Sequence, residues 1–354
     1  MRFYKVPGIS IAVIDVGRVE WARGYGVLEL STKRPVTPDT LFQACSISKP
    51  IAAIAALRLV EQGKLNLDTD VNQKLVSWKI PENEFTKEKK VTLRRLLSHT
   101  AGITVSGLPG YAVEKAVPNL LQILNGIAPA NSKPIRVDIE PGSQWRYSGG
   151  GFLVLQQLLI DVAGKPFAEL MREMVLEKLE MKNSTYQQPL PRSLTVRAAR
   201  GYHEDGAMVK GGWHIYPEMA AGGLWSTASD LARVAIELQN SKAGKSNKVL
   251  SPRMANEMLS DQMDQFPVAM VSKRYGREIR NQGLGFRLEG TGRAARFSYH
   301  GGKVGYTCFI VAYTETGQGA VVMTNSDNGV ELIQEIIRSI AKEYHWLDYP
   351  FAPM

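Results

Sequence analysis

The spacing of hydrophobic residues changes along the chain, and both ends have the pattern of β-strands. Apolar, β-branched positions fill residues 9–16 and 19–30, and the intervening Gly17-Arg18 predicts a hairpin. Toward the C-terminus further segments have the same character: LGFRL, ARFSYH, YTCFIVAY and AVVMTN. Residues 330–344 have helical spacing and predict a closing helix.

The middle of the chain has mostly helical spacing, interrupted by long loops. Helices are predicted for the segments 152–165, 167–179 and 229–240. Ser229 or Asp230 is expected to cap the last of these. Residues 104–135 and 201–222 are expected to be loops that shape a substrate pocket.

Strands at both ends and helices between them predict a two-lobed α+β fold. An antiparallel sheet assembled from both termini would contain residues 1–65 and 280–354. Residues 66–279 would then form a mostly helical lobe that carries the active-site loops. A cleft between the lobes is the expected place for chemistry.

A nearly all-apolar helix begins with the sequence Ser46-Ile47-Ser48-Lys49. Residues three apart lie on one helix face, so the Lys49 amine can reach the Ser46 hydroxyl. Apolar surroundings disfavour an ammonium group, so Lys49 can serve as a neutral base for a serine nucleophile. The spacing alone also fits a capping Ser46 and a Lys49 that extends to solvent.

Two residues next to glycine runs are further candidates. Tyr147 comes shortly before three glycines and a buried helix, so its hydroxyl can face a cleft, or its ring can close the loop by packing. His300 stands at a strand end before two glycines, where either a ligand approaches closely or the chain turns. His99 is interpreted as a structural residue that bonds a loop.

Other catalytic and ligand-binding motifs are missing from the sequence. It contains no G-x-S-x-G, no H-E-x-x-H and no pair of C-x-x-C motifs, so neither an α/β-hydrolase elbow nor a zinc site is predicted. Residues 290–295 imitate the dinucleotide-binding pattern G-x-G-x-x-A, but strand-like rather than helical residues follow them.

Composition and charge are those of a soluble globular protein. The chain has 354 residues, 44% of them hydrophobic and 22% charged, and a net charge of +9. The basic residues are dispersed without an aromatic groove, so no nucleic-acid partner is expected. No apolar run reaches the ~18–20 residues of a membrane span. Cys45 and Cys308 are too few for a disulfide framework and are expected to be buried thiols.

The N-terminal segment MRFYKVPGISIAVIDVG lacks the long apolar core and the cleavage site of a signal peptide. As written, the chain is expected in the cytoplasm. A leader upstream of this chain would instead direct it to the periplasm or outside the cell. Nothing in the sequence predicts an oligomeric state.

Three motifs, in this order and spacing, resemble those of the serine β-lactamase and penicillin-binding-protein superfamily. The similarity is greatest to class C β-lactamases and family VIII carboxylesterases. The matching segments are Ser46–Lys49 for S-x-x-K, Tyr147–Gly149 for Y-x-N and His300–Gly302 for K-T-G. The resemblance also includes RGYGVLEL, LLSHTAGI and GGLWSTASDLAR, so it extends over nearly the whole chain.

The resemblance implies an acyl-enzyme mechanism without a metal or organic cofactor. Ser46 would attack a carbonyl carbon, and water would later release the acid. Lys49 and Tyr147 would share the proton transfers, and either of them can be the acylation base. The oxyanion would be held by the backbone N–H groups of Ser46 and Lys303.

Two departures from the motifs bear on the substrate. Gly149 has no side chain where an asparagine would contact a substrate amide. His300 replaces a lysine and, with a usual pKa of about 6.5, carries less charge at neutral pH. A site with His300, Gly301, Gly302 and Gly149 as substrate-binding residues therefore fits a small neutral ester or an amide better than a β-lactam.

The sequence thus predicts a serine hydrolase with a small-molecule substrate, most directly a carboxylesterase for short-chain esters. The alternative is a β-lactamase or D-amino-acid peptidase that uses the same residues on amides. A third possibility is a non-catalytic penicillin-binding sensor that is acylated without turnover. Trp213, Tyr216 and Glu218 either line the substrate pocket or pack in the interior.

Overall fold

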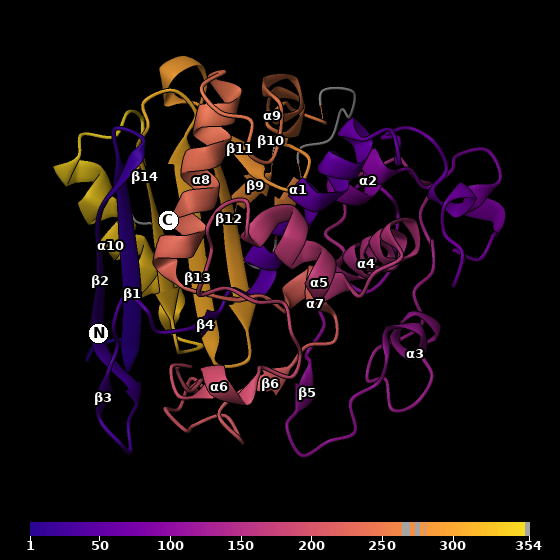
Figure 1. Cartoon of the computed structure of the whole chain (residues 1–354). Coiled ribbons are helices and arrows are strands. Elements are labelled where there is room, and N and C mark those ends of the chain that lie inside the picture. The colour runs from indigo at the N-terminus through magenta and orange to yellow at the C-terminus, as the bar shows by residue number, and fades with distance from the viewer. Residues whose placement is uncertain (264–269, 273–276, 280, 351–354) are drawn as a thin grey trace.

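The two ends of the chain meet in one antiparallel sheet. The structure is a computed structural model that describes residues 1–263, 270–272, 277–279 and 281–350. Figure 1 shows the N-terminal hairpin beside the C-terminal strands. In spatial order, the eight strands are β10 (Asn281–Gln282), β11 (Arg287–Glu289), β12 (Arg296–Lys303), β13 (Tyr306–Tyr313), β14 (Gly319–Thr324), β1 (Gly8–Asp15), β2 (Arg18–Glu29) and β3 (Arg34–Pro35).

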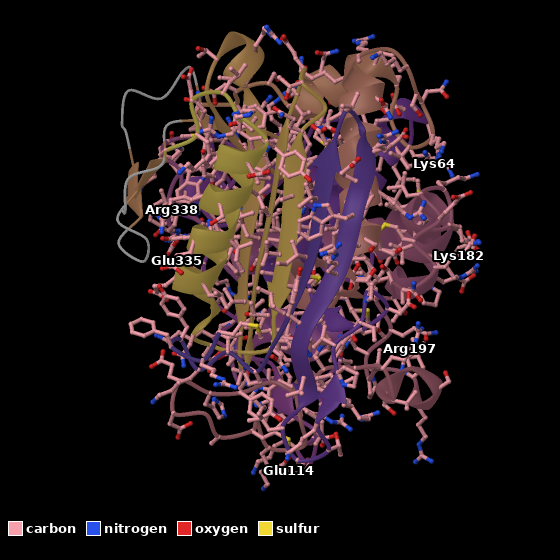
Figure 2. The ribbon with its side chains drawn as sticks, turned by 90° about the vertical axis from the view of Figure 1, so that its left-hand side faces the viewer. Lys64, Glu114, Lys182, Arg197, Glu335 and Arg338 are labelled. Atoms are coloured by element: carbon pink, nitrogen blue, oxygen red, sulfur yellow. The ribbon has the colours of Figure 1, made fainter. Side chains whose placement is uncertain are left out.

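Side chains along each strand alternate between the two faces of the sheet. In the central strands, the side chains on both faces are buried. On β1, Ala12 and Ile14 join the core that includes α8 (Ala228–Lys242). Ile11 and Val13 join the smaller core beneath α10 (Gly329–Glu343). Figure 2 shows α10 against the sheet, with the labelled Glu335 and Arg338 directed outward.

Most of the other helices lie together on one side of the sheet (Figure 1). They are α1 (Ser48–Glu61), α2 (Leu93–Leu97), α3 (Leu120–Asn125), α4 (Gly149–Ala163), α5 (Phe167–Met171), α6 (Arg192–Thr195), α7 (Met219–Gly222) and α9 (Pro252–Met258). Short strand pairs also occur: β4 (Phe42–Gln43) with β7 (Trp225–Ser226), β5 (Tyr111–Ala112) with β6 (His214–Ile215), and β8 (Met270–Ser272) with β9 (Arg277–Ile279).

The helices α1 and α4 carry or flank the candidate site, and both are deeply buried. A 3-10 turn, Cys45–Ile47, leads into α1, whose residues from Ser48 to Leu57 are all buried. The absence of a polar face is therefore explained by packing of α1 against α4 and α7. On α4, the Ser148 hydroxyl accepts a hydrogen bond from the Gly151 N–H at 2.9 Å and caps the first turn.

The structure confirms the α+β class, the N-terminal hairpin and the closing helix. The cap predicted for 229–240 is wrong: Thr227 has extended backbone, and its hydroxyl accepts from the Asp230 N–H at 3.1 Å. The segment 167–179 is not one regular helix, because α5 continues as the wider π-helical turn Arg172–Leu176.

The predicted division into residues 1–65 with 280–354, and 66–279, stays a prediction. One helix from the second segment, α8, packs directly on β1, β13 and β14. Among the described residues, no helix combines the length and apolarity needed to cross a lipid bilayer.

Candidate active site

Ser46 lies in the 3-10 turn just before α1, and its side chain borders a cleft. The preceding residue, Cys45, has a φ of 52°, in the left-handed region that non-glycine residues rarely adopt. Its buried thiol lies 3.2 Å from the Gln43 carbonyl oxygen, a contact that helps hold this conformation. The turn thus presents Ser46 to the cleft, while Cys45 and Ile47 remain in the core.

Lys49 follows in the first turn of α1, where its residue surface is only 2% exposed. Its Nζ donates hydrogen bonds to Ser46 Oγ at 3.2 Å and to the Ala221 carbonyl oxygen at 2.6 Å. Burial deprives the ammonium of water and lowers the pKa of Lys49 to about 7. A large share of this residue is therefore free amine at neutral pH.

Tyr147 reaches Ser46 from the loop before α4. Its hydroxyl donates to Ser46 Oγ at 2.9 Å, and Lys49 Nζ lies 5.0 Å from the centroid of its ring. Burial raises the pKa of Tyr147 above the usual 10.0, so the side chain stays a neutral phenol. The Ser46 hydroxyl is thus in contact with an amine and a phenol from two different elements.

His99 packs against Tyr147, with 4.7 Å between the ring centroids. Its Nδ1 accepts a hydrogen bond from the Ser148 N–H at 3.3 Å, and its Nε2 lies 3.3 Å from the Tyr299 hydroxyl. Burial, with the nearby Lys49 charge as a second cause, keeps the pKa of His99 well below 6.5. His99 is thus a neutral, buried side chain whose hydrogen bonds are structural, in line with its interpretation from the sequence.

The strand β12 lies directly against the turn that carries Ser46, and Gly301 permits this approach. A Cβ atom on Gly301 would lie 2.4 Å from Cys308 Sγ and 2.8 Å from the Ala44 carbonyl oxygen. Any side chain here would push the strand away from the turn. Both cysteines are buried, unpaired thiols at this contact, as expected.

The hydrogen bonds between β12 and β13 decide which backbone N–H groups of β12 face the cleft. The Thr314 N–H donates to the Ala295 carbonyl at 2.9 Å, and bonded pairs recur at every second residue of an antiparallel ladder. The register then makes Lys303 and Tyr306 a bonded pair. The Lys303 N–H is therefore directed to β13, whereas the Gly302 N–H is directed to the open edge of β12, beyond the residues that pair with β11. This geometry favours Gly302 rather than Lys303 as an oxyanion donor.

His300 and Gly149 both border the cleft. His300 lies opposite Phe309 in the strand register, with 4.1 Å between their ring centroids, so its ring packs on the α10 side of the sheet. A Cβ atom on Gly149 would lie 2.9 Å from the Ser106 carbonyl oxygen and 3.1 Å from Leu108 Cδ1. Glycine at this position lets the 104–108 loop approach α4.

The cleft has a volume of about 910 Å³ and contains Ser46, Lys49 and Tyr147. Its wall includes Leu108 and His203, from the two loops that were expected to shape the pocket. It also includes groups that the sequence did not indicate: Arg287, Tyr299, Asp327, Glu331 and the side chain of Lys303. Of these groups, only the Lys303 side chain could have been predicted. Side chains alternate along a strand, which places Lys303 on the same face of β12 as Gly301.

Of the three residues in the 201–222 loop that were open to two interpretations, one borders the cleft. Tyr216 lines it, whereas Trp213 packs on Trp225 with 5.2 Å between ring centroids. Glu218 is fully buried. The described part of the chain contains no group of three or more His, Cys, Asp or Glu side chains arranged to hold a metal ion.

At the cleft, the fold brings the Ser46 hydroxyl into contact with Lys49 and Tyr147. The family model described as Beta-lactamase matches residues 1–344, so the chain belongs to the beta-lactamase family. The matched range includes both ends of the chain, which form the antiparallel sheet, and the region between them.

Relatives within this family carry different names. The chain is 27% identical to Protein flp of Staphylococcus aureus (strain MW2) over 52% of this chain and 35% of that protein. It is 30% identical to Esterase EstB of Burkholderia gladioli over 58% of this chain and 52% of that protein. The matches thus span from about a third to half of the length of these relatives.

A solved structure with the same fold is the octameric penicillin-binding protein homologue from Pyrococcus abyssi. The TM-score is 0.73 at 24% identity, over 97% of this chain and 79% of that chain. The two structures therefore share their fold over nearly the whole of this chain.

Proposed function

We propose that the chain is a carboxylesterase that cleaves short-chain esters through an acyl-enzyme on Ser46. The observation that carries the proposal is that Lys49 and Tyr147 both donate hydrogen bonds to Ser46 Oγ, at 3.2 and 2.9 Å. A serine becomes a nucleophile when a positioned base removes its proton during attack. The similarity to a protein named an esterase adds support.

Lys49 is the better candidate for the base of acylation. Its lowered pKa, about 7, leaves free amine available at neutral pH, whereas burial raises the pKa of Tyr147. A neutral amine can still donate one hydrogen to the Ala221 carbonyl while its lone pair faces the Ser46 hydroxyl. Tyr147 would then pass a proton to the leaving alkoxide.

The negative oxygen of the tetrahedral intermediate would be held by two backbone N–H groups, those of Ser46 and Gly302. Gly302 follows Gly301, the residue at which β12 packs on the Ser46 turn. Donors of this kind are worth about 3–4 kcal/mol each in other hydrolases. The proposal therefore replaces the Lys303 amide expected from the sequence with the Gly302 amide.

The reaction balances without any further reactant than water. Ser46 Oγ forms a bond to the acyl carbon, the bond to the alkoxy oxygen breaks, and the serine proton reaches the departing alcohol. Water then attacks the acyl-enzyme, one of its protons returns to Ser46, and the free acid leaves. The lack of a polar side chain at Gly149 supports esters over amides whose side chain needs a hydrogen-bond partner.

The test measures hydrolysis of p-nitrophenyl acetate and butyrate by the wild type, Ser46→Ala and Ser339→Ala. Ser339 is an exposed serine on α10 and serves as the matched control. We expect turnover by the wild type and the control and none by Ser46→Ala. Full activity of Ser46→Ala would overturn the proposal, and faster hydrolysis of nitrocefin than of the esters would favour an amide substrate. Stoichiometric labelling of Ser46 without turnover would indicate a sensor.

A further inference from the structure

The side chain of Lys303, the last residue of β12, enters the cleft next to the proposed catalytic groups. Its Nζ donates to the Leu108 carbonyl at 2.7 Å and lies 4.3 Å from the centroid of the Tyr216 ring. Both of these partners border the cleft, as does Lys303, which retains partial exposure there. A lysine is thus held in the wall of the cleft by groups from two other segments.

This ammonium has hydrogen-bonding capacity left for a ligand. An ammonium carries three donors, and the Leu108 carbonyl uses one of them. Among the described residues, no carboxylate forms an ion pair with Lys303 within 4.0 Å, the distance that defines such a pair. The aromatic face of Tyr216 stabilises the positive charge but accepts no conventional hydrogen bond.

A buried carboxyl group lies near Lys303 without filling its donors. Glu218 is 0% exposed, and neither of its side-chain oxygens has a hydrogen-bond partner in the described part of the molecule. Burial raises the pKa of Glu218 to about 7, and the Lys303 charge opposes this shift. Glu218 is therefore a group that supports the positive charge of Lys303 from inside the protein.

The position of Lys303 relates it to the acyl part of a substrate. Lys303 follows Gly302, whose N–H is the proposed donor to the acyl carbonyl oxygen. The acyl chain begins at that carbonyl, so a short chain that runs along the Leu108 and Tyr216 wall brings its far end to the Lys303 ammonium. A carboxylate at that end would complete a charge-assisted hydrogen bond.

We propose that Lys303 recognises a carboxylate at the free end of a short acyl chain, so that the preferred substrates are monoesters of short dicarboxylic acids. This inference rests on the proposed esterase function. It replaces the neutral ester expected from the sequence, because the positive charge missing at His300 is present at Lys303 instead.

The test compares mono-(4-nitrophenyl) glutarate with 4-nitrophenyl pentanoate, which has an acyl chain of equal length and no charge. The measured quantity is the ratio of kcat/KM for the anionic ester to that for the neutral one. We expect Lys303→Met to lower this ratio about 10- to 100-fold, the usual effect of one charged hydrogen bond. Lys303→Arg should retain most of the ratio, and the exposed Lys64→Met, the matched control, should leave it unchanged (Figure 2).

The dependence on pH separates recognition by charge from a packing role of Lys303. Burial, with the Lys49 charge second, lowers the pKa of Lys303 to about 8, while Glu218, Tyr147 and Cys45 oppose the shift. The preference for the anionic ester should therefore decline as pH rises through about 8. In Glu218→Gln an opposing negative charge is gone, so this decline should move to lower pH. An unchanged profile would contradict the role given to Glu218.

The outcomes distinguish this inference from the function on which it rests. Hydrolysis of both esters with the same ratio in wild type and Lys303→Met would overturn the role of Lys303 and leave the esterase standing. A Lys303-dependent preference for 4-acetoxybenzoate, which carries its charge on the alcohol, would overturn the assignment to the acyl chain. Failure to hydrolyse any of these esters would overturn both.

Discussion

At Ser46 the groups proposed to transfer protons come from two elements of the fold. Lys49 is one turn further along the same helical segment, whereas Tyr147 is contributed by the loop before α4. The amine is buried, and in the described part of the chain no carboxylate pairs with it, so its free-base form is favoured. Base strength at this site is thus set by burial in the α1 core.

The role of Lys49 predicts the pH dependence of ester hydrolysis. Protonated Lys49 cannot accept the Ser46 proton, so kcat/KM for a neutral ester should rise with pH through about 7 and level off above it. Lys49→Met should lower kcat/KM by about 10²- to 10⁴-fold, the usual contribution of a positioned base. The measurement is the pH profile of p-nitrophenyl butyrate hydrolysis by both proteins. A wild-type profile that is flat between pH 5 and 9 would contradict the assignment.

Some residues of the site could be predicted from the sequence more directly than others. Ser46 and Lys49 are predictable because they are three positions apart in one helical segment, and the helical repeat can bring their side chains together. Tyr147 and His300 became candidates through their glycine neighbours and the resemblance of their motifs. For Glu218 the sequence left a pocket wall and the interior as alternatives, and it gave no sign of the proximity to Lys303, which depends on contacts between remote segments.

Among the strands and helices, β12 contributes most directly to the proposed chemistry, through its backbone N–H groups. Its N–H groups alternate between β13 and the open edge, and this alternation directs the Gly302 N–H, rather than that of Lys303, away from β13. The motif alone does not reveal which of two neighbouring amides points outward. The hydrogen-bonded register of the strand was needed, and the sequence does not contain it explicitly.

The close packing of β12 predicts a selective loss of activity in Gly301→Ala. The added Cβ would meet Cys308 Sγ at 2.4 Å and Ala44 O at 2.8 Å, so the strand must move away from the Ser46 turn. Misplacement of an oxyanion donor by about 1 Å can reduce kcat/KM by about 10²-fold. Overpacking should also destabilise the fold by about 1–3 kcal/mol. Ester kinetics and thermal unfolding measure the two effects.

Gly151→Ala is the matched control for Gly301→Ala. Gly151 lies in the first turn of α4, and the atom nearest to its added Cβ would be 3.6 Å away, an ordinary contact. This variant should therefore keep its activity and its melting temperature. Equal losses in Gly151→Ala and Gly301→Ala would contradict the explanation by strand displacement.

At the scale of the whole molecule, the site needs both ends of the chain. The Ser46 turn follows the N-terminal hairpin, whereas β12 belongs to the C-terminal strands, and the two are in contact. The sheet brings them together because β1 pairs with β14 on one edge and β2 on the other. Tyr147 comes from the helical region that the chain forms between these ends.

Much of this architecture could be predicted from hydrophobic spacing. Period-two patterns at the two ends indicated the strands, and their placement indicated a sheet assembled from both termini. Two loops were expected to shape the pocket, but the placement of single residues in the cleft wall could not be predicted in the same way. Leu108, Tyr216 and Arg287 lie on irregular or short elements, where periodicity has too few residues to define a direction.

The central claim, that Ser46 is the activated nucleophile, is tested most directly by mapping the residue that a fluorophosphonate modifies. The protein is treated with the reagent, digested and analysed by mass spectrometry, alongside Ser46→Ala and Lys49→Met. If Ser46 is the nucleophile and Lys49 its base, we expect one adduct on Ser46 in the wild type, none in Ser46→Ala and much slower labelling in Lys49→Met. An adduct on another residue, or ester hydrolysis that persists after Ser46 is fully modified, would contradict the claim.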